Sequence, residues 1–204
     1  MKTMIKNAAI LFAITLIAGF VLGFVYQNTK GLIAEREALD KKNACMEVFK
    51  EAKDFKAVPD FFTQDIRDDF NQNGYENETI DELVEAVDEK GNTLGYVFTI
   101  TTSQGYAGDI QFTLGIKNDG TVNGISLLAI NETAGLGMQA EDVLKPQFAN
   151  KNVELFEYTK NGSTADNQID AISGATITTN AITSGVNSGL YYFRTVLGGG
   201  NADE

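Results

Sequence analysis

The chain lacks histidine altogether and has a single cysteine, Cys45. It therefore cannot build a Ser-His-Asp triad, a His-ligated zinc site or a His-ligated haem. One thiol forms no internal disulfide and cannot hold an iron–sulfur cluster, which needs several thiolates. Within a helical pattern, Cys45 is expected to be a small packed side chain. Any redox chemistry must therefore depend on an organic cofactor.

Positive charge is scarce as well. The 16 basic residues face 28 acidic ones, which gives a net charge of -12 and a pI near 4.4. This balance argues against nucleic acid or anionic lipid headgroups as the main partner and is typical of an exposed, soluble domain. No G-x-G-x-x-G sequence follows a strand and opens a helix, so we expect no nicotinamide site. A chain of 204 residues fits one anchored globular domain.

Charged residues are absent from Asn7 to Thr29. Within this stretch, residues 8–26 supply nearly the ~20 apolar residues that a membrane-spanning helix needs. A cleaved signal peptide is the alternative, but its apolar region usually has only ~7 to 15 residues, and no Ala-x-Ala site follows closely here. We therefore predict a transmembrane anchor over residues 1–29.

The charges that flank this span leave its orientation open. The basic residues near it are Lys2 and Lys6 before the span and Lys30, Arg36, Lys41 and Lys42 after it. Counted alone, they favour a cytoplasmic location for the chain that follows the span. A long C-terminal domain can nevertheless be translocated regardless of such charges, so the count does not decide the topology.

Residues 30–58 are rich in good helix formers and predict a stalk helix. Its apolar positions Leu32, Leu39, Met46 and Phe49 recur at steps of seven and three, close to one helical face. Pro59 marks its end, because the residue before a proline avoids the helical region.

Residues 60–82 are acidic and rich in turn-forming residues. Asp69, Asn71, Asn73 and Gly74 match the opening of an EF-hand calcium loop. The twelfth position of such a loop should be a bidentate glutamate but is Ile80, and no preceding helix is evident. We interpret the segment as an Asx-rich turn and predict no metal site.

The remainder of the chain predicts an α+β domain over residues 59–197, an antiparallel sheet packed with helices. Alternating patterns separated by turn residues predict strands at residues 83–88, 94–102, 109–116 and 121–130. A C-terminal amphipathic helix is indicated by the spacing of Ile182, Val186, Leu190, Phe193 and Leu197. Residues 198–204 are expected to form a disordered tail.

One loop before this helix has residue types suited to an anionic ligand. Residues 170–176 read D-A-I-S-G-A-T. Small side chains allow a bulky group to approach, and a helix beginning near Thr178 would favour a phosphate within reach of Thr176. Alternatively, Thr178 or Thr179 is only an N-cap and Ser173-Gly174 only a turn. The residues alone leave both interpretations open.

Residues 170–179, DAISGATITT, resemble the flavinylation motif of a known FMN-binding domain. The G subunit of the Rnf complex and the C subunit of the sodium-translocating NADH:quinone reductase share this domain. Residues 105–110, GYAGDI, resemble its G-Y-G-G-x-I segment, and residues 132–137, ETAGLG, resemble its E-T-P-G-L-G segment. Ala107 and Ala134 depart from the pattern, and the missing proline predicts a looser turn before Gly135.

The resemblance implies one FMN, joined to Thr176 by a phosphoester bond. It implies further cofactor contacts from Ser173, Gly174, Ala175, Thr178, Thr179, Glu132, Thr133, Gly135, Leu136 and Gly137. A threonine hydroxyl is a poor nucleophile and the chain has no histidine to activate it, so attachment should need another protein. By resemblance, this is a magnesium-dependent flavin transferase that takes FMN from FAD.

Two charged residues have alternative interpretations. Asp170 is either a recognition contact for the transferase or a strand-end carboxylate that bonds within its own turn. Lys145 is either a partner of the phosphate or an exposed helical lysine.

The length of the chain favours the G subunit of the Rnf complex over the equivalent part of the quinone reductase. The resemblance then implies an electron relay that works with the other Rnf proteins to couple ferredoxin and NAD to ion movement. It also implies a cytoplasmic N-terminus and a flavin domain on the outer face of the cytoplasmic membrane. The alternatives are the quinone reductase component and an acidic extracytoplasmic binding or scaffold module without cofactor.

Overall fold

The computed structural model describes residues 1–199, so residues 200–204 of the expected tail lie outside the described residues. The chain divides into two compact units, residues 1–40 and 41–204. The second unit begins well before residue 59, where we placed the start of the domain.

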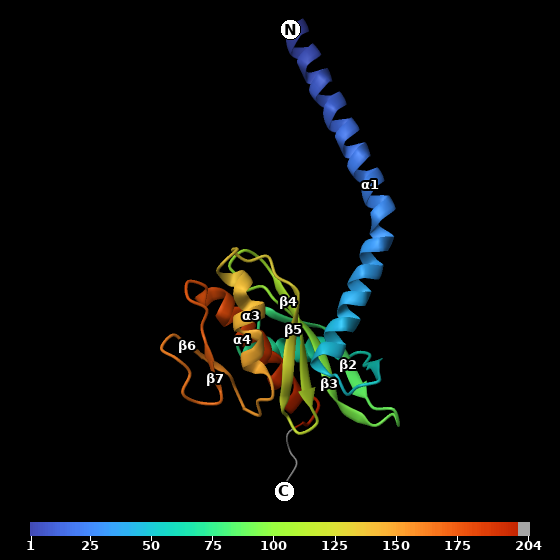
Figure 1. Ribbon diagram of the computed structural model, residues 1–204. Coiled ribbons are helices and arrows are strands. Elements are labelled where there is room, and N and C mark those ends of the chain that lie inside the picture. Colours follow the sequence, from blue (N-terminus) through green and yellow to red (C-terminus); the bar gives the residue numbers. More distant parts are fainter. Residues whose placement is uncertain (200–204) are drawn as a thin grey trace. The chain divides into compact units, whose positions relative to one another are not determined.

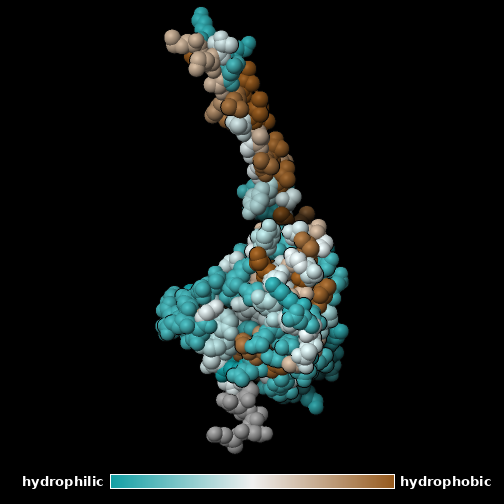
Figure 2. Space-filling model, turned by 90° about the vertical axis from the view of Figure 1, so that its left-hand side faces the viewer, coloured by the Kyte–Doolittle hydropathy of each residue, from teal (hydrophilic) through white to brown (hydrophobic). Residues whose placement is uncertain are grey.

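Helix α1 (Lys2–Val48) contains all of the first unit except Met1. Its large apolar side chains are exposed, including Phe12, Phe20 and Phe24 at 67%, 74% and 65%. In Figure 2 the hydrophobic colour is concentrated along the N-terminal half of this helix. Among the described residues it is the one helix that is long and apolar enough to cross a membrane.

The predicted stalk helix extends too far, because α1 ends at Val48 and not at residue 58. Strand β1 (Asp54–Ala57) follows it and pairs with an edge of the sheet. The Lys53 N–H donates to the Val87 carbonyl at 2.8 Å, and Phe49 is buried at 1% exposure. Burial of Phe49 and pairing of the backbone override the helix propensity of this segment.

The sheet of the second unit is an antiparallel meander in the order β1-β2-β3-β4-β5 (Figure 1). Its other strands are β2 (Glu78–Val87), β3 (Thr93–Thr102), β4 (Ile110–Lys117) and β5 (Val122–Ala129). The four predicted strands are confirmed, although β2 begins earlier than residue 83. Gly91 and Gly120 have φ of 82° and 83° in the hairpin turns, which glycine adopts without strain.

One face of this sheet is covered by α4 (Thr176–Thr195), which confirms the predicted C-terminal helix. Leu197 lies beyond its end. Gly185 and Gly189 let the helix approach closely, because a Cβ added at Gly189 would lie 2.4 Å from Leu114 Cδ2. The helix packs on the buried side chains of Phe98, Ile100, Phe112 and Leu114.

The end of α1 covers part of the opposite face. Val48 and Phe49 form a small core there with Val84 and Val97. Cys45 is half-buried beside this core, and burial, together with the Glu82 carboxylate, raises the pKa of its thiol to about 11. The expected packing role of Cys45 is therefore confirmed.

Shorter elements complete the second unit. They are α2 (Gln64–Gln72), η1 (Gly137–Gln139), α3 (Ala140–Val143), η2 (Lys145–Phe148) and the parallel pair β6 (Glu157–Thr159) and β7 (Gln168–Asp170). The interpretation of Asp69 to Gly74 as a turn is wrong in part, because Asp69 lies inside α2 and only Asn73 and Gly74 end it. Asp69 accepts a hydrogen bond from the Tyr191 hydroxyl at 2.7 Å, which ties α2 to α4.

Candidate functional site

The three segments singled out in the sequence converge on one cavity of about 480 Å³. Residues 105–110 contribute Tyr106, residues 132–137 contribute most of one wall, and residues 174–178 contribute the opposite wall. Cavities that bind small molecules and cofactors have volumes of roughly 300 to 1,000 Å³. The cavity is therefore large enough for a cofactor.

Glu132 joins the three segments. Its side chain is buried, its Oε2 accepts from the Thr178 hydroxyl at 2.8 Å and its Oε1 accepts from the Ala107 N–H at 3.2 Å. A buried carboxylate needs such donors, because desolvation without them is costly. One side chain thus fixes both loops against the first turn of α4.

Two glycines allow this close packing around Glu132. A Cβ added at Gly137 would lie 2.6 Å from Thr178 Oγ1 and 2.6 Å from Glu132 Cβ. A Cβ added at Gly105 would lie 2.1 Å from the Gly108 carbonyl oxygen. Any larger residue at either position would force the loops apart.

A tight turn leads into α4. The Ala175 N–H donates to the Ile172 carbonyl at 3.0 Å, which closes a four-residue β-turn over residues 172–175. Its third residue, Gly174, has a positive φ of 77°, which glycine adopts without strain. The helix begins at Thr176 and not near Thr178, and its N-cap residue Ala175 offers no side-chain cap. The alternative interpretation of Thr178 or Thr179 as the N-cap is therefore wrong.

The hydroxyl groups of the three nearby threonines differ in their environment. Thr178 donates to Glu132, and Thr179 donates to the Ala175 carbonyl and accepts from the Ile172 N–H, at 3.0 and 3.1 Å. Both side chains are buried. Thr176 is half-buried at the cavity wall, and its hydroxyl makes no hydrogen bond within residues 1–199.

The backbone of the first turn is also available to a ligand. The N–H groups of residues 176–178 precede the first intrahelical bond of α4, which Thr179 donates to Ala175. They carry the partial positive charge of the helix N-terminus. An anionic group attached at Thr176 would be stabilised there.

Two family models match this chain. The model described as the RnfG N-terminal region matches residues 1–48, and the model described as the FMN-binding domain matches residues 105–191. The G subunit of the Na(+)-translocating ferredoxin:NAD(+) oxidoreductase complex of Acetobacterium woodii is 35% identical over 95% of this chain and 93% of its own length. The chain belongs to the RnfG family.

Two further proteins are similar to this RnfG family member. The G subunit of the ion-translocating oxidoreductase complex of Methanosarcina acetivorans is 30% identical over 94% of this chain and 95% of its own length. The crystal structure of Shewanella oneidensis NqrC has a TM-score of 0.47 at 19% identity, over 56% of this chain and 58% of that chain.

The cavity of this RnfG family member brings together most of the contact residues expected from the sequence. The expected residues that line it are Glu132, Thr133, Leu136, Gly137, Gly174, Ala175, Thr176 and Thr178. Ser173 and Gly135 belong to the same turns without lining it, and Thr179 faces the core. Tyr106 and Ile177 line it although we did not assign them; each lies within a segment that the sequence had singled out.

Asp170 makes a bond within its own loop. It ends β7, and its carboxylate accepts from the Ser163 hydroxyl at 3.3 Å. The Gln147 side chain bonds to the Asp170 backbone twice: it accepts from the Asp170 N–H at 2.7 Å and donates to the Asp170 carbonyl at 3.1 Å. The interpretation as a strand-end carboxylate in a local bond therefore describes this geometry, whereas recognition by a transferase stays a prediction.

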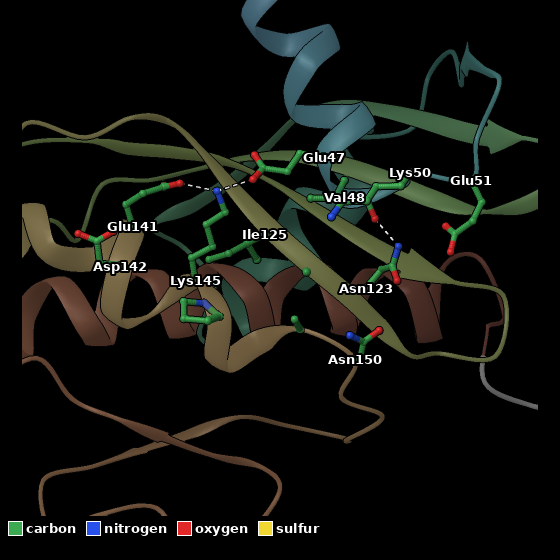
Figure 3. A pocket seen from close by; sticks show the side chains of 13 residues that line it. Glu47, Val48, Lys50, Glu51, Asn123, Ile125, Glu141, Asp142, Lys145 and Asn150 are labelled. Atoms are coloured by element: carbon green, nitrogen blue, oxygen red, sulfur yellow. Dashed lines mark hydrogen bonds and ion pairs between the residues drawn. The ribbon is translucent and has the colours of Figure 1, made fainter.

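Lys145 fits neither of its two interpretations. It lines a second cavity of about 550 Å³, which shares no lining residue with the first among the described residues. Its Nζ lies 2.7 Å from Glu47 Oε1 and also pairs with Glu141, as Figure 3 shows. Burial lowers the pKa of Lys145, but the pairing with Glu141 and Glu47 outweighs it and raises the pKa. Lys145 is a paired lysine that joins the end of α1 to η2.

Proposed function

We propose that this protein is a membrane-anchored electron carrier of an ion-translocating ferredoxin:NAD oxidoreductase complex, with FMN joined to Thr176 by a phosphoester bond. The FMN-binding family model covers residues 105–191, which supply every wall of the cavity. The relative from Acetobacterium woodii is named as a subunit of such a complex. The other subunits of the complex are the proposed partners.

The observation that carries the proposal is the position of Thr176. Of the three threonines at the start of α4, it is the one whose hydroxyl is left without a hydrogen bond in the described chain. It is also the first residue of the helix, so its phosphoester would meet the free N–H groups of the first turn.

The remaining walls of the cavity suit a flavin ring. Tyr106, Leu136 and Ile177 are exposed by 68%, 39% and 52% and offer apolar surface to a planar aromatic group. No lysine or arginine is among the described residues that line the cavity, so the backbone of α4 provides the positive potential for the phosphate. When bound, FMN would supply the electron-transfer chemistry; the first turn of α4 would hold its phosphate, and Tyr106, Leu136 and Ile177 would contact its ring.

Attachment of the cofactor needs a second protein. The carboxylate that lines the cavity, Glu132, is already bonded to Thr178 and Ala107 and so is poorly placed to activate another hydroxyl. We assign this step to a flavin transferase that uses FAD and magnesium, with Asp170 as a recognition contact. The local bond of Asp170 to Ser163 would then present the loop in a fixed conformation.

Intact-mass measurement tests the attachment. The chain produced together with the transferase should gain the mass of one FMN phosphoester, with flavin fluorescence that survives denaturing electrophoresis. Thr176→Ala should abolish both signals, whereas the matched variant Thr178→Ser should keep them. An adduct that persists in Thr176→Ala would move the acceptor to another residue. A colourless wild-type protein from a host with the transferase would support a scaffold module instead.

We further propose that residues 1–29 span the membrane with the N-terminus in the cytoplasm and the flavin domain on the outer face. The exposed apolar surface of this part of α1 and the match to the family's N-terminal region support the anchor. Protease added to intact spheroplasts should digest the chain beyond residue 30. Protection until lysis would place the domain in the cytoplasm, as the flanking charges alone suggest.

A further inference from the structure

Glu78 is a buried carboxyl group that the proposed attachment site does not use. It begins β2 and is 1% exposed, and its two carboxyl oxygens differ in their hydrogen bonding. Oε1 accepts from the hydroxyls of Ser184 and Thr102 and from the Gln104 amide, at 2.7, 3.3 and 3.1 Å. Oε2 has no hydrogen-bond partner among the described residues. Such an orphaned buried atom requires a physical explanation.

The two oxygens favour opposite protonation states. Three donors on Oε1 stabilise a negative charge there, while a charged Oε2 without any donor is costly in a buried position. Burial outweighs these hydrogen bonds and raises the pKa of Glu78, and the Glu76 carboxylate adds to this direction. A further negative charge nearby would raise the pKa of this carboxyl in the same direction.

A short hydrogen-bond path leads from Glu78 through Gln104 to Asn180, on the second turn of α4. The Gln104 amide donates to Glu78 and accepts from the Asn180 side chain at 3.2 Å. Asn180 follows Thr176 by one turn of α4, and Gln104 shortly precedes Tyr106 in the cavity wall. Ser184 lies roughly two turns, about 12 Å, beyond Thr176 along the helix axis.

Resting on the proposed function, we propose that Glu78 is a redox-linked proton acceptor, which takes up one proton from solvent on Oε2 when the cofactor at Thr176 gains an electron. The electron comes from a reduced one-electron carrier of the complex, and the proton bonds to the previously unpaired oxygen. Negative charge added to the domain is thereby offset. The axial separation of Thr176 and Ser184 sets the scale: at about 12 Å and an effective dielectric constant of about 20, one charge changes the proton affinity of another group about tenfold.

A third cavity lies beside one of the hydrogen-bond donors of Glu78. Ser184, which donates to Glu78, lines this cavity of about 390 Å³ together with Tyr75 and Glu157. The ionisable groups around this network are Glu76, Tyr75, Glu157 and Tyr158, together with Arg194, whose charge acts on Tyr75. Arg194 already carries a positive charge and cannot take up a proton, and water screens the exposed Glu76 and Glu157 from an added electron, so the buried Glu78 is the carboxyl that responds to it.

The electrostatic link can be tested without flavin. Thr176→Asp places a negative charge at the attachment position, and Thr176→Asn is its neutral control. Because the folded pKa of Glu78 lies above the unfolded value of about 4.3, its contribution to stability is present below that pH and lost as the pH rises through the folded pKa. Urea unfolding across pH should show this loss in the full chain and not in Glu78→Gln.

We expect the upper end of this loss, which follows the folded pKa, to be up to about one pH unit higher in Thr176→Asp than in Thr176→Asn. Carbon NMR titration of the Glu78 carboxyl in the same two variants gives the pKa directly and does not depend on the folding of Glu78→Gln. Equal values in the two variants would overturn the proposal.

The redox step itself is measured on the flavinylated chain. Reduction with dithionite in a weakly buffered solution with a pH indicator should take up fewer protons per electron in Glu78→Gln than in wild type. Asp81→Asn, an exposed carboxylate variant on the same strand, should match wild type. Equal uptake in Glu78→Gln and wild type would refute the role of Glu78. Failure to find flavin by mass would instead refute the attachment and leave the charge-variant result valid.

Discussion

The first turn of α4 and its middle differ in what surrounds them. Residues 176–179 carry four polar or exposed side chains and meet two loops, and Glu132 holds these loops against them. The middle of the helix has Gly185 and Gly189, whose backbone lies directly on Phe112 and Leu114 of the sheet. The middle therefore anchors the helix to the sheet, and the first turn presents the Thr176 hydroxyl to the cavity. Stability and cofactor attachment should respond to different substitutions.

The largest loss of stability is expected in the middle of the helix. Gly189→Leu would force a side chain into the space that Leu114 occupies, because even a Cβ would lie 2.4 Å from its Cδ2. Overpacking of this kind costs about 3 kcal/mol. Chemical unfolding measures it, and Gly31→Ala, in open space on α1, is the control that should lose no stability. A loss of unfolding free energy below about 1 kcal/mol would show that the sheet side chains rearrange easily to accommodate a larger residue on α4.

An intermediate loss is expected at Thr178, which belongs to the first turn but bonds to the buried Glu132. Thr178→Val leaves Glu132 Oε2 without its donor at 2.8 Å, and an unsatisfied buried acceptor costs about 2 kcal/mol. Thr178→Ser keeps the hydroxyl and should recover most of this stability. If the two variants unfold at the same urea concentration, the contact with Glu132 is not what holds the loops.

A smaller effect on stability is expected at Thr176 itself. Its hydroxyl makes no hydrogen bond in the described chain and its side chain is only half-buried, so Thr176→Ala should change the unfolding free energy of the unmodified protein by less than about 0.5 kcal/mol. The same substitution should remove all covalent flavin. A large destabilisation would mean that the residue is structural, and loss of flavin would then prove little.

Deletion of residues 1–29 is expected to have the smallest effect on the stability of α4 and on its acceptance of flavin. The second unit begins at Lys41 and contains the sheet, α4 and the cavity, so the shortened chain should fold, stay soluble and accept flavin. It should fail to restore ferredoxin-linked NAD reduction to membranes that lack the full-length protein, because tethering raises the local concentration of the domain. Full restoration at stoichiometric amounts would show that the anchor is dispensable.

The sequence predicted the four main strands and α4 because their patterns are local. Alternating residues with Asp119-Gly120 between them specify a hairpin, and steps of three and four residues specify a helix face. Strand β1 was missed because residues 50–57 favour a helix, and their pairing with β2 is decided by contacts distant in the sequence. The start of α4 was placed too late because Ala175 carries no capping side chain.

The candidate site was found in the sequence as three separate segments, but their arrangement was not. No pattern indicated that Glu132 would accept from both Ala107 and Thr178, because a buried carboxylate and an exposed one look alike in sequence. The same limit applies to Lys145, whose partner Glu47 is far away in the chain. Tertiary contacts of polar side chains are the part that the sequence does not specify locally.

The uncapped start of α4 has a consequence for maturation. Ala175 leaves the first N–H groups of a long, buried helix without a side-chain acceptor. A phosphoester on Thr176 would supply oxygen acceptors and negative charge at this position, as a phosphorylated residue does at the start of a helix. The phosphate would thus accept from the N–H groups that Ala175 leaves uncapped, so the start of α4 would reach its full rigidity only after the cofactor had been attached.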